Sequence, residues 1–159
     1  MSYAPRQLGH LVMRVRDLDR SLDFYTRIMG LTIMERSPSG TVFMSANTEK
    51  SHELAIRAMG LDAPGPDSSR VGQAHMAWQM ESFEDLQELY SRLKENNVRI
   101  QRIGDHGISL GVYFLDPDDN EIEVYYEVPK SQWQRSADKG LFGGNFPRKL
   151  EEPAGVADN

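Results

Sequence analysis

The chain has 159 residues, of which 39% are hydrophobic and 26% charged, a composition typical of one soluble globular domain. It contains no cysteine, so any metal ion must be held by histidine and carboxylate side chains. The net charge of -6 disfavours nucleic acid as a partner, and no run of about 18 uncharged apolar residues predicts a membrane span. Because the N-terminus has no signal-peptide pattern either, we expect a cytoplasmic protein.

An internal repeat organises the sequence. When residues 9–30 are placed over residues 74–95, at an offset of 65, His10 falls on His75. The apolar positions of the two segments also coincide, although their identity is low. The match predicts two copies of one supersecondary unit.

The first copy predicts a strand, a helix and three further strands. Residues 8–15 alternate between apolar and polar side chains, which indicates a half-buried strand. Asp17 is a suitable N-cap for the helix that follows, and Gly30 is a suitable stop. The remaining strands are expected at residues 31–35, 41–46 and 53–58.

The second copy repeats this order. A strand is expected over residues 73–80, and Ser82 with Asp85 three positions later forms a capping box that opens a helix. The final strands are expected at residues 98–102, 110–115 and 120–128. The two copies predict an α+β fold of tandem βαβββ modules, whose mixed sheet curves into a cup with the helices outside.

Composition marks the boundaries of these modules. We expect a single domain over residues 1–128, and its parts are module one (6–60), a linker containing Pro and Gly (61–72) and module two (73–128). Residues 129–159 have few periodic apolar side chains and predict a C-terminal tail that is ordered only in part. Within the tail, the candidates for folding back are Leu141, Phe142 and Phe146.

Strand alternation sorts the titratable residues by face. His10 and His75 oppose the apolar residues of their strands, so both point away from the helices. The glutamates of the last strand do the same: Glu121, Glu123 and Glu127. Two imidazoles with one carboxylate are the facial ligand set of non-heme Fe(II) oxygenases, and the same set accepts Mn(II), Zn(II) or Ni(II).

These modules resemble the vicinal oxygen chelate superfamily, which contains glyoxalase I, fosfomycin-resistance transferases, bleomycin-binding proteins and type I extradiol dioxygenases. The resemblance covers residues 7–129 and rests on the stretches LGHLVMRVRDLDRSLDFYTRIMGL, HMAW and YFLDPDDNEIEVYYEVP. It implies that His10, His75 and Glu123 are the metal ligands. Asp119 stands where the family usually has glycine, and aspartate tolerates a left-handed backbone better than most residues.

The finer pattern is similar to that of extradiol dioxygenases. His52 stands at the position of their acid–base histidine, and alternation places it on the face of Leu54 and Ile56. In GDHGISLGVYFLDPDDN, His106 and Tyr113 match a supporting histidine and an active-site tyrosine. All four histidines of the chain therefore match positions that this chemistry uses. The resemblance implies a ring-cleaving dioxygenase that uses Fe(II) and takes a catechol-type aromatic diol and O2.

Other members of the superfamily remain alternatives. Glyoxalase I needs a fourth ligand, a glutamate in the last strand of module one, where the repeat places Leu54 or Ala55 and where Glu53 is one residue away. A fosfomycin-type thiol transferase needs a cationic pocket, and residues 104–113 contain no basic cluster. Bleomycin-type binding proteins generally lack the ligand set. Two modules with an exposed apolar sheet edge also predict a homodimer, the commonest closed symmetry.

Overall fold

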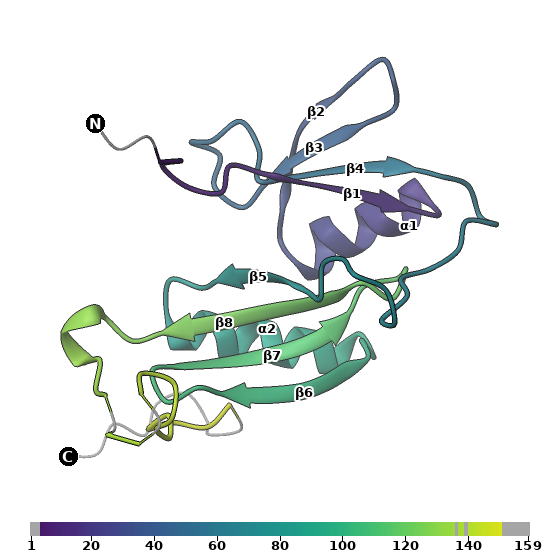
Figure 1. Cartoon of the computed structure of the whole chain (residues 1–159). Coiled ribbons are helices and arrows are strands. Elements are labelled where there is room, and N and C mark those ends of the chain that lie inside the picture. The colour runs from purple at the N-terminus through teal and green to yellow at the C-terminus, as the bar shows by residue number, and fades with distance from the viewer. Residues whose placement is uncertain (1–3, 136, 139, 151–159) are drawn as a thin grey trace. The chain divides into compact units, whose positions relative to one another are not determined.

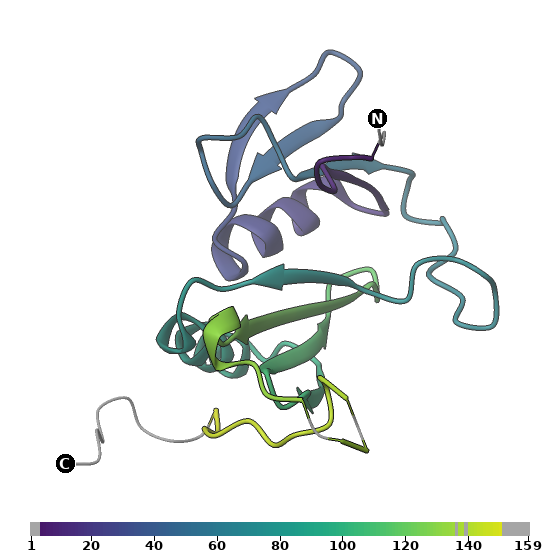
Figure 2. The ribbon, with the colours of Figure 1, turned by 60° about the vertical axis from the view of Figure 1, so that its left-hand side comes forward.

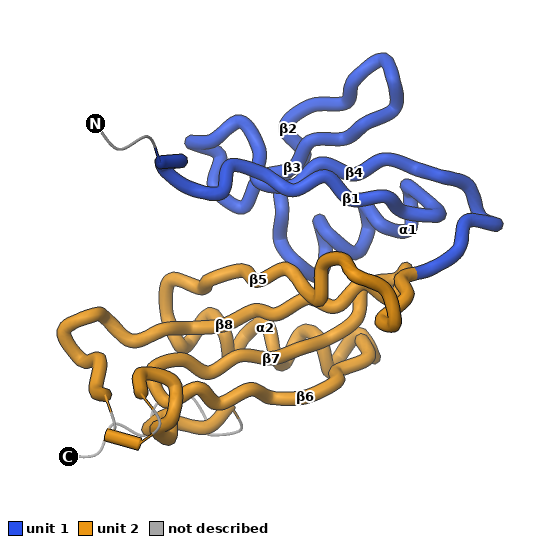
Figure 3. Tube along the Cα trace, viewed as in Figure 1, with its two compact units in different colours: residues 1–65 blue, residues 66–159 orange. Residues whose placement is uncertain are grey.

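The computed structural model describes residues 4–135, 137–138 and 140–150. The chain divides into two compact units, residues 1–65 and residues 66–159 (Figure 3). Each unit has one four-stranded mixed sheet with a helix against one face, so the predicted α+β fold of two βαβββ modules is confirmed (Figure 1). None of the helices in the described part of the chain has the length and apolar character needed to cross a membrane.

Unit 1 has the strand order β1-β4-β3-β2, in which β1 and β4 run parallel and the other neighbours run antiparallel. Tyr25 is fully buried under this sheet, where its hydroxyl lies 3.5 Å from the sulfur of Met13. The elements are β1 (Leu11–Val15), α1 (Leu18–Asp23), a π-helical segment (Phe24–Ile28), β2 (Thr32–Arg36), β3 (Val42–Ser45) and β4 (Leu54–Ala58).

The predicted first helix forms, but its second half is wider than an α-helix. Asp17 caps it as expected, because its side chain accepts a hydrogen bond from the amide of Arg20. The Thr26 hydroxyl donates to the Leu22 carbonyl, and the last turn closes through π-type bonds. The helix ends at Gly30, whose φ of 77° is a conformation that glycine adopts without strain.

Unit 2 has the same topology, with the order β5-β8-β7-β6 and a parallel pair β5–β8. The capping box of Ser82 and Asp85 is confirmed at the start of the helix. The elements are β5 (Met76–Gln79), α2 (Phe83–Glu95), β6 (Ile100–Asp105), β7 (Ser109–Leu115), β8 (Glu121–Glu127) and a short 3-10 helix (Lys130–Gln132).

One buried aspartate organises the turn between β7 and β8. The buried carboxylate of Asp116 accepts hydrogen bonds from the amides of Asp118 and Asn120, at 2.8 and 2.9 Å. Asp119 has a φ of 71°, a left-handed conformation that aspartate tolerates better than most residues. Its side chain is bound by Arg99.

Strand pairing shows how closely the two units repeat each other. In unit 1, Val12 pairs with Ala55. In unit 2, Ala77, which is 65 residues after Val12, pairs with Glu123. Glu123 therefore occupies in unit 2 the place that Ala55 occupies in unit 1. This register also fixes which side chains share the sheet face that points away from each helix.

Part of the C-terminal tail folds back, as the sequence allowed (Figure 2). Phe146 is buried and stacks on Phe83 with 5.6 Å between ring centroids. Arg148 forms an ion pair of 2.8 Å with Glu84 at the start of α2. Phe142, by contrast, is 62% exposed. The tail is thus held on unit 2 by an aromatic contact and an ion pair, and Leu150 is buried as well.

Candidate metal centre

Unit 2 brings two of the expected ligands together. His75 immediately precedes β5, and Glu123 lies in the middle of β8, the strand paired with it. The imidazole Nε2 is 3.2 Å from a carboxylate oxygen of Glu123. Glu123 is only 8% exposed, and His75 is the only basic side chain among the described residues whose nitrogen lies within 4 Å of its carboxylate. Burial of a carboxylate is costly unless positive charge compensates it.

This donor set fits a divalent metal ion. An imidazole nitrogen and a carboxylate oxygen are ligands that Fe(II), Mn(II) and Zn(II) accept, and a cation there would compensate the buried charge of Glu123. Within the described ranges, no three His, Asp or Glu side chains already form a metal cluster. Of the three expected ligands, the structure of unit 2 brings His75 and Glu123 together, while His10 belongs to unit 1.

Tyr113 stands beside this pair. It is the register partner of Glu123 on β7, and its ring meets the ring of His75 edge-on, with 5.3 Å between centroids. Its hydroxyl lies 3.3 Å from Nε2 of His106. Burial, reinforced by the neighbouring Glu123, raises the pKa of Tyr113 to about 12. The phenol therefore stays protonated near neutral pH and can donate a hydrogen bond.

Arg102 is a member of this cluster that the sequence did not single out. Its guanidinium lies over the Tyr113 ring, 3.7 Å from the ring centroid, and binds both carboxylate oxygens of Glu121 at 3.0 and 3.1 Å. The Glu121 carboxylate raises the pKa of Arg102. A β-bulge after Ile100 brings Arg102 opposite Tyr113. Sequence alternation cannot show such a bulge.

Two glycines leave the space that the cluster needs. Gly104 and Gly111 are register partners on β6 and β7. A Cβ atom at Gly104 would lie 2.7 Å from the Tyr113 ring, and one at Gly111 would lie 2.8 Å from a carboxylate oxygen of Glu123. Any larger residue at either position would displace one of these side chains.

Unit 1 brings together its own two candidate site residues, His10 and His52. The rings of His10 and His52 lie 4.6 Å apart, and His52 meets Phe43 edge-on at 5.0 Å. The prediction that His52 shares the face of Leu54 was wrong. The strand begins only at Leu54, so alternation does not reach His52, whose ring contacts Phe43 instead. Phe43 pairs with Ala55, on the face opposite to the buried side chain of Leu54.

The register also locates the position of the fourth ligand that glyoxalase I needs. Ala55 occupies it, and a methyl group cannot bind a metal ion. The neighbouring Glu53 is engaged elsewhere, because its carboxylate accepts a hydrogen bond of 2.6 Å from the hydroxyl of Ser45. Unit 1 thus offers histidines but no carboxylate at the place equivalent to Glu123.

Comparison with known proteins assigns the family. Residues 7–124 match the model of the Glyoxalase/Bleomycin resistance protein/Dioxygenase superfamily. The chain therefore belongs to this superfamily, in agreement with the resemblance in its sequence. Its members include metal-dependent dioxygenases, lyases and thiol transferases.

Individual relatives differ in their reactions. The chain is 30% identical over 128 residues to a catechol-2,3-dioxygenase of Bacillus subtilis (strain 168), covering 80% of this chain but 44% of that protein. It is 28% identical to the metallothiol transferase FosB of Staphylococcus saprophyticus, covering 76% of both proteins. A crystal structure of a superfamily domain from Frankia sp. EAN1pec has a TM-score of 0.67 and 23% identity, covering 79% of this chain and all of that domain. The chain thus spans less than half the length of the dioxygenase relative.

Proposed function

We propose that this chain is a ring-cleaving (extradiol) dioxygenase, which acts on a catechol-type aromatic diol with O2. The observation that carries the proposal is the cluster in unit 2, where Glu123 lies beside His75 and Tyr113, and Tyr113 lies beside His106. These are residue types that extradiol chemistry requires. The similarity to the Bacillus subtilis catechol-2,3-dioxygenase supports the same reaction.

The proposed metal ligands are His10, His75 and Glu123, and the proposed metal is Fe(II), with Mn(II), Zn(II) and Ni(II) as alternatives. When bound, Fe(II) would supply a redox-active centre at which the diol and O2 react. Three protein ligands are the number that such centres use, and Ala55 adds no fourth. The buried carboxylate of Glu123 supports a cation at this place.

The proposed catalytic residues are His52, His106 and Tyr113. His52 takes a proton from a substrate hydroxyl, which an imidazole can do near neutral pH. Tyr113 keeps its own proton and donates a hydrogen bond to the oxygen on which negative charge develops. His106 holds the phenol oxygen from one side, and Arg102 holds the ring from its face.

The alternatives receive less support from the same residues. Glyoxalase chemistry lacks its fourth carboxylate at Ala55. A thiol transferase for a phosphonate would need a cationic pocket, but the guanidinium of Arg102 is already bound by Glu121. A binding protein without metal would leave Glu123 buried with only an imidazole as its basic partner among the described side chains.

The test is anaerobic reconstitution of the purified chain with Fe(II), followed by a panel of catechols in air. A yellow ring-cleavage product is expected from at least one diol. Parallel samples reconstituted with Mn(II), Zn(II) and Ni(II) identify the active metal. A chain that binds one Fe(II) and cleaves none of the diols would overturn the proposed reaction.

We also propose that the chain works in the cytoplasm as a homodimer, the commonest closed symmetry. Light scattering at micromolar concentration is expected to give about twice the chain mass of 18.1 kDa. A mass near 18 kDa would contradict the dimer without affecting the proposed ligand set.

A further inference from the structure

One carboxylate accepts hydrogen bonds both from the turn that carries His106 and from the C-terminal segment, residues 140–150. Asp105 ends β6, directly before His106. One oxygen of its carboxylate accepts hydrogen bonds from the amides of Gly107 and Phe146, at 2.8 and 2.9 Å. The other oxygen lies 3.1 Å from the same Phe146 amide. A single side chain therefore joins the turn after β6 to a backbone 41 residues further along the chain.

The same two segments touch through glycines. Gly107 has a φ of 75°, and a Cβ atom there would lie 2.7 Å from the backbone nitrogen of Gly144. The backbones of the turn and the C-terminal segment thus approach each other as closely as glycine allows. The ring of Phe142 also lies 6.4 Å from the ring of His106, centroid to centroid.

The C-terminal segment can act as a support because it is itself anchored. Phe146 is buried against Phe83, the first residue of α2, and meets Tyr126 of β8 edge-on at 6.3 Å. Arg148 adds an ion pair with Glu84. The Phe146 amide, which donates a hydrogen bond to Asp105, therefore belongs to a residue that is fixed on the helix-covered face of the sheet.

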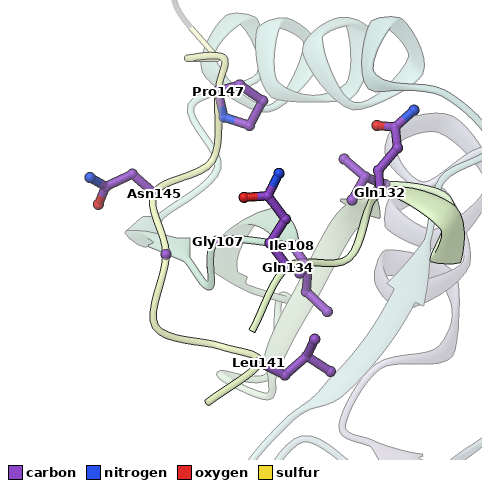
Figure 4. A pocket seen from close by; sticks show the side chains of 9 residues that line it. Gly107, Ile108, Gln132, Gln134, Leu141, Asn145 and Pro147 are labelled. Atoms are coloured by element: carbon purple, nitrogen blue, oxygen red, sulfur yellow. The ribbon is translucent and has the colours of Figure 1, made fainter. Parts of the chain in front are cut away.

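An open space lies beside these contacts. A cleft of about 470 Å3 lies between the turn and the C-terminal segment, and Gly107 and Ile108 line it on one side, with Leu141 and Asn145 on the other (Figure 4). None of the proposed metal ligands lines this cleft. At this edge the two segments are joined by the hydrogen bonds of Asp105, by the contact between Gly107 and Gly144 and by the ring contact of His106 with Phe142.

We propose that Asp105 is a positioning residue, which holds the His106 turn against the C-terminal segment so that the imidazole stays within reach of the Tyr113 hydroxyl. The hydrogen bonds that the Asp105 carboxylate accepts come from the backbone amides of Gly107 and Phe146, so it acts on His106 through the backbone of the turn. The kinetic part of its test rests on the proposed function, whereas the structural part does not.

The kinetic test compares Asp105→Ala with Asp105→Asn in the full, Fe(II)-loaded chain. Asp105→Ala removes both hydrogen bonds and is expected to lower kcat on the order of tenfold, with KM and iron content unchanged. Asp105→Asn keeps an amide oxygen that can accept from Gly107 and Phe146, so it should restore most of kcat. In a His106→Ala background, Asp105→Ala should cause no further loss. Equal losses in the two backgrounds would overturn the proposal.

The structural test needs no turnover. In the metal-free full chain with 15N-labelled histidine, the His106 ring signal is identified by its loss in His106→Ala. Asp105→Ala should shift or broaden this signal, and Asp105→Asn should leave it near its original position. Phe146→Ala, which releases the anchor and keeps Asp105, should disturb the same signal. It replaces Asp105→Ala as the test variant if Asp105→Ala does not fold. An unchanged His106 signal in a folded Asp105→Ala chain overturns the positioning role. A disturbed signal in a protein that cleaves no diol overturns only the proposed function.

Discussion

Unit 1 and unit 2 have the same strand order and the same register, yet equivalent positions carry different chemical groups. His10 and His75 correspond to each other. Ala55, however, stands where unit 2 has Glu123, and its cross-strand partner Phe43 stands where unit 2 has Tyr113. Unit 2 therefore adds a carboxylate and a phenol to a frame that in unit 1 carries only hydrocarbon at these places.

The correspondence extends to an irregularity in the sheets. Each sheet has a bulge in its edge strand, after Ile33 in unit 1 and after Ile100 in unit 2. The residue that follows the bulge is Glu35 in unit 1 and Arg102 in unit 2. Only in unit 2 does this residue bring a cation onto an aromatic ring. The repeat thus preserves the backbone geometry, while the chemistry has become specific to one unit.

His52 shows the opposite asymmetry. Three residues before Ala55 stands His52, and three residues before Glu123 stands Asn120, whose side chain binds Asp116 within a turn. The proposed proton-transfer group thus comes from unit 1 alone. The comparison teaches that neither sheet carries the full set of residues that the proposed reaction needs.

Among the residues that are not proposed ligands, His52 should have the largest effect on turnover, and only unit 1 provides it. His52→Gln should reduce turnover of the diol on the order of 10²- to 10⁴-fold, the usual contribution of a positioned general acid–base group. Metal content and substrate binding should stay unchanged, since His52 is not a proposed ligand. Steady-state kinetics with metal analysis checks this. Loss of metal would make His52 a ligand, and unchanged turnover would leave it a role in packing against Phe43.

Converting a residue of unit 2 into its counterpart in unit 1 should lower kcat somewhat less than His52→Gln does. Tyr113→Phe reproduces the side chain of Phe43 and removes one hydrogen-bond donor, which is typically worth on the order of 10²- to 10³-fold in kcat. The ring, and with it the contact to Arg102, is retained. Measured kcat should therefore fall while KM and thermal stability change little. A kcat equal to that of the wild type would remove Tyr113 from the proposed chemistry.

The smallest expected effect is the pH dependence of stability that comes from the Tyr113 phenol. The pKa of Tyr113 is raised from 10.0 to about 12, mainly by burial and then by Glu123. Because the folded-state pKa is the higher one, the folded chain keeps a proton that the unfolded chain loses, and the related stability is fully present below pH 10 and lost as pH rises through about 12. In the metal-free protein, the absorbance difference at about 295 nm between wild type and Tyr113→Phe should titrate near pH 12. A midpoint near 10 would contradict the burial and the Glu123 contact.

Much of the fold could be predicted because it depends on local signals. The offset of 65, the N-cap Asp17 and the capping box at Ser82 are written in residue spacing, and all three are present in the structure. The left-handed backbone at Asp119 was implied by the family resemblance rather than by residue spacing. Predicted strands differed from the observed ones mainly at their ends, where alternation gives no sharp boundary.

The rest depends on tertiary contacts. The face of His52 was predicted wrongly, because the start of β4 at Leu54 is set by pairing rather than by alternation. The contact of Arg102 with Tyr113 follows from a bulge, which no spacing rule shows. That Phe146 packs on Phe83 while Phe142 stays exposed is likewise decided by the surface available on unit 2.

Metal analysis of four variants tests most directly the proposed ligand set of His10, His75 and Glu123. The wild-type chain should bind one Fe(II) after anaerobic reconstitution, whereas His10→Ala, His75→Ala and Glu123→Ala should bind none and keep their circular dichroism spectra. Glu121→Ala is the matched control, because Glu121 lies on the same strand, 3.9 Å from the other nitrogen of His75, but is bound by Arg102. This control should retain its metal. Full Fe(II) occupancy in His10→Ala, His75→Ala or Glu123→Ala would contradict the proposed centre.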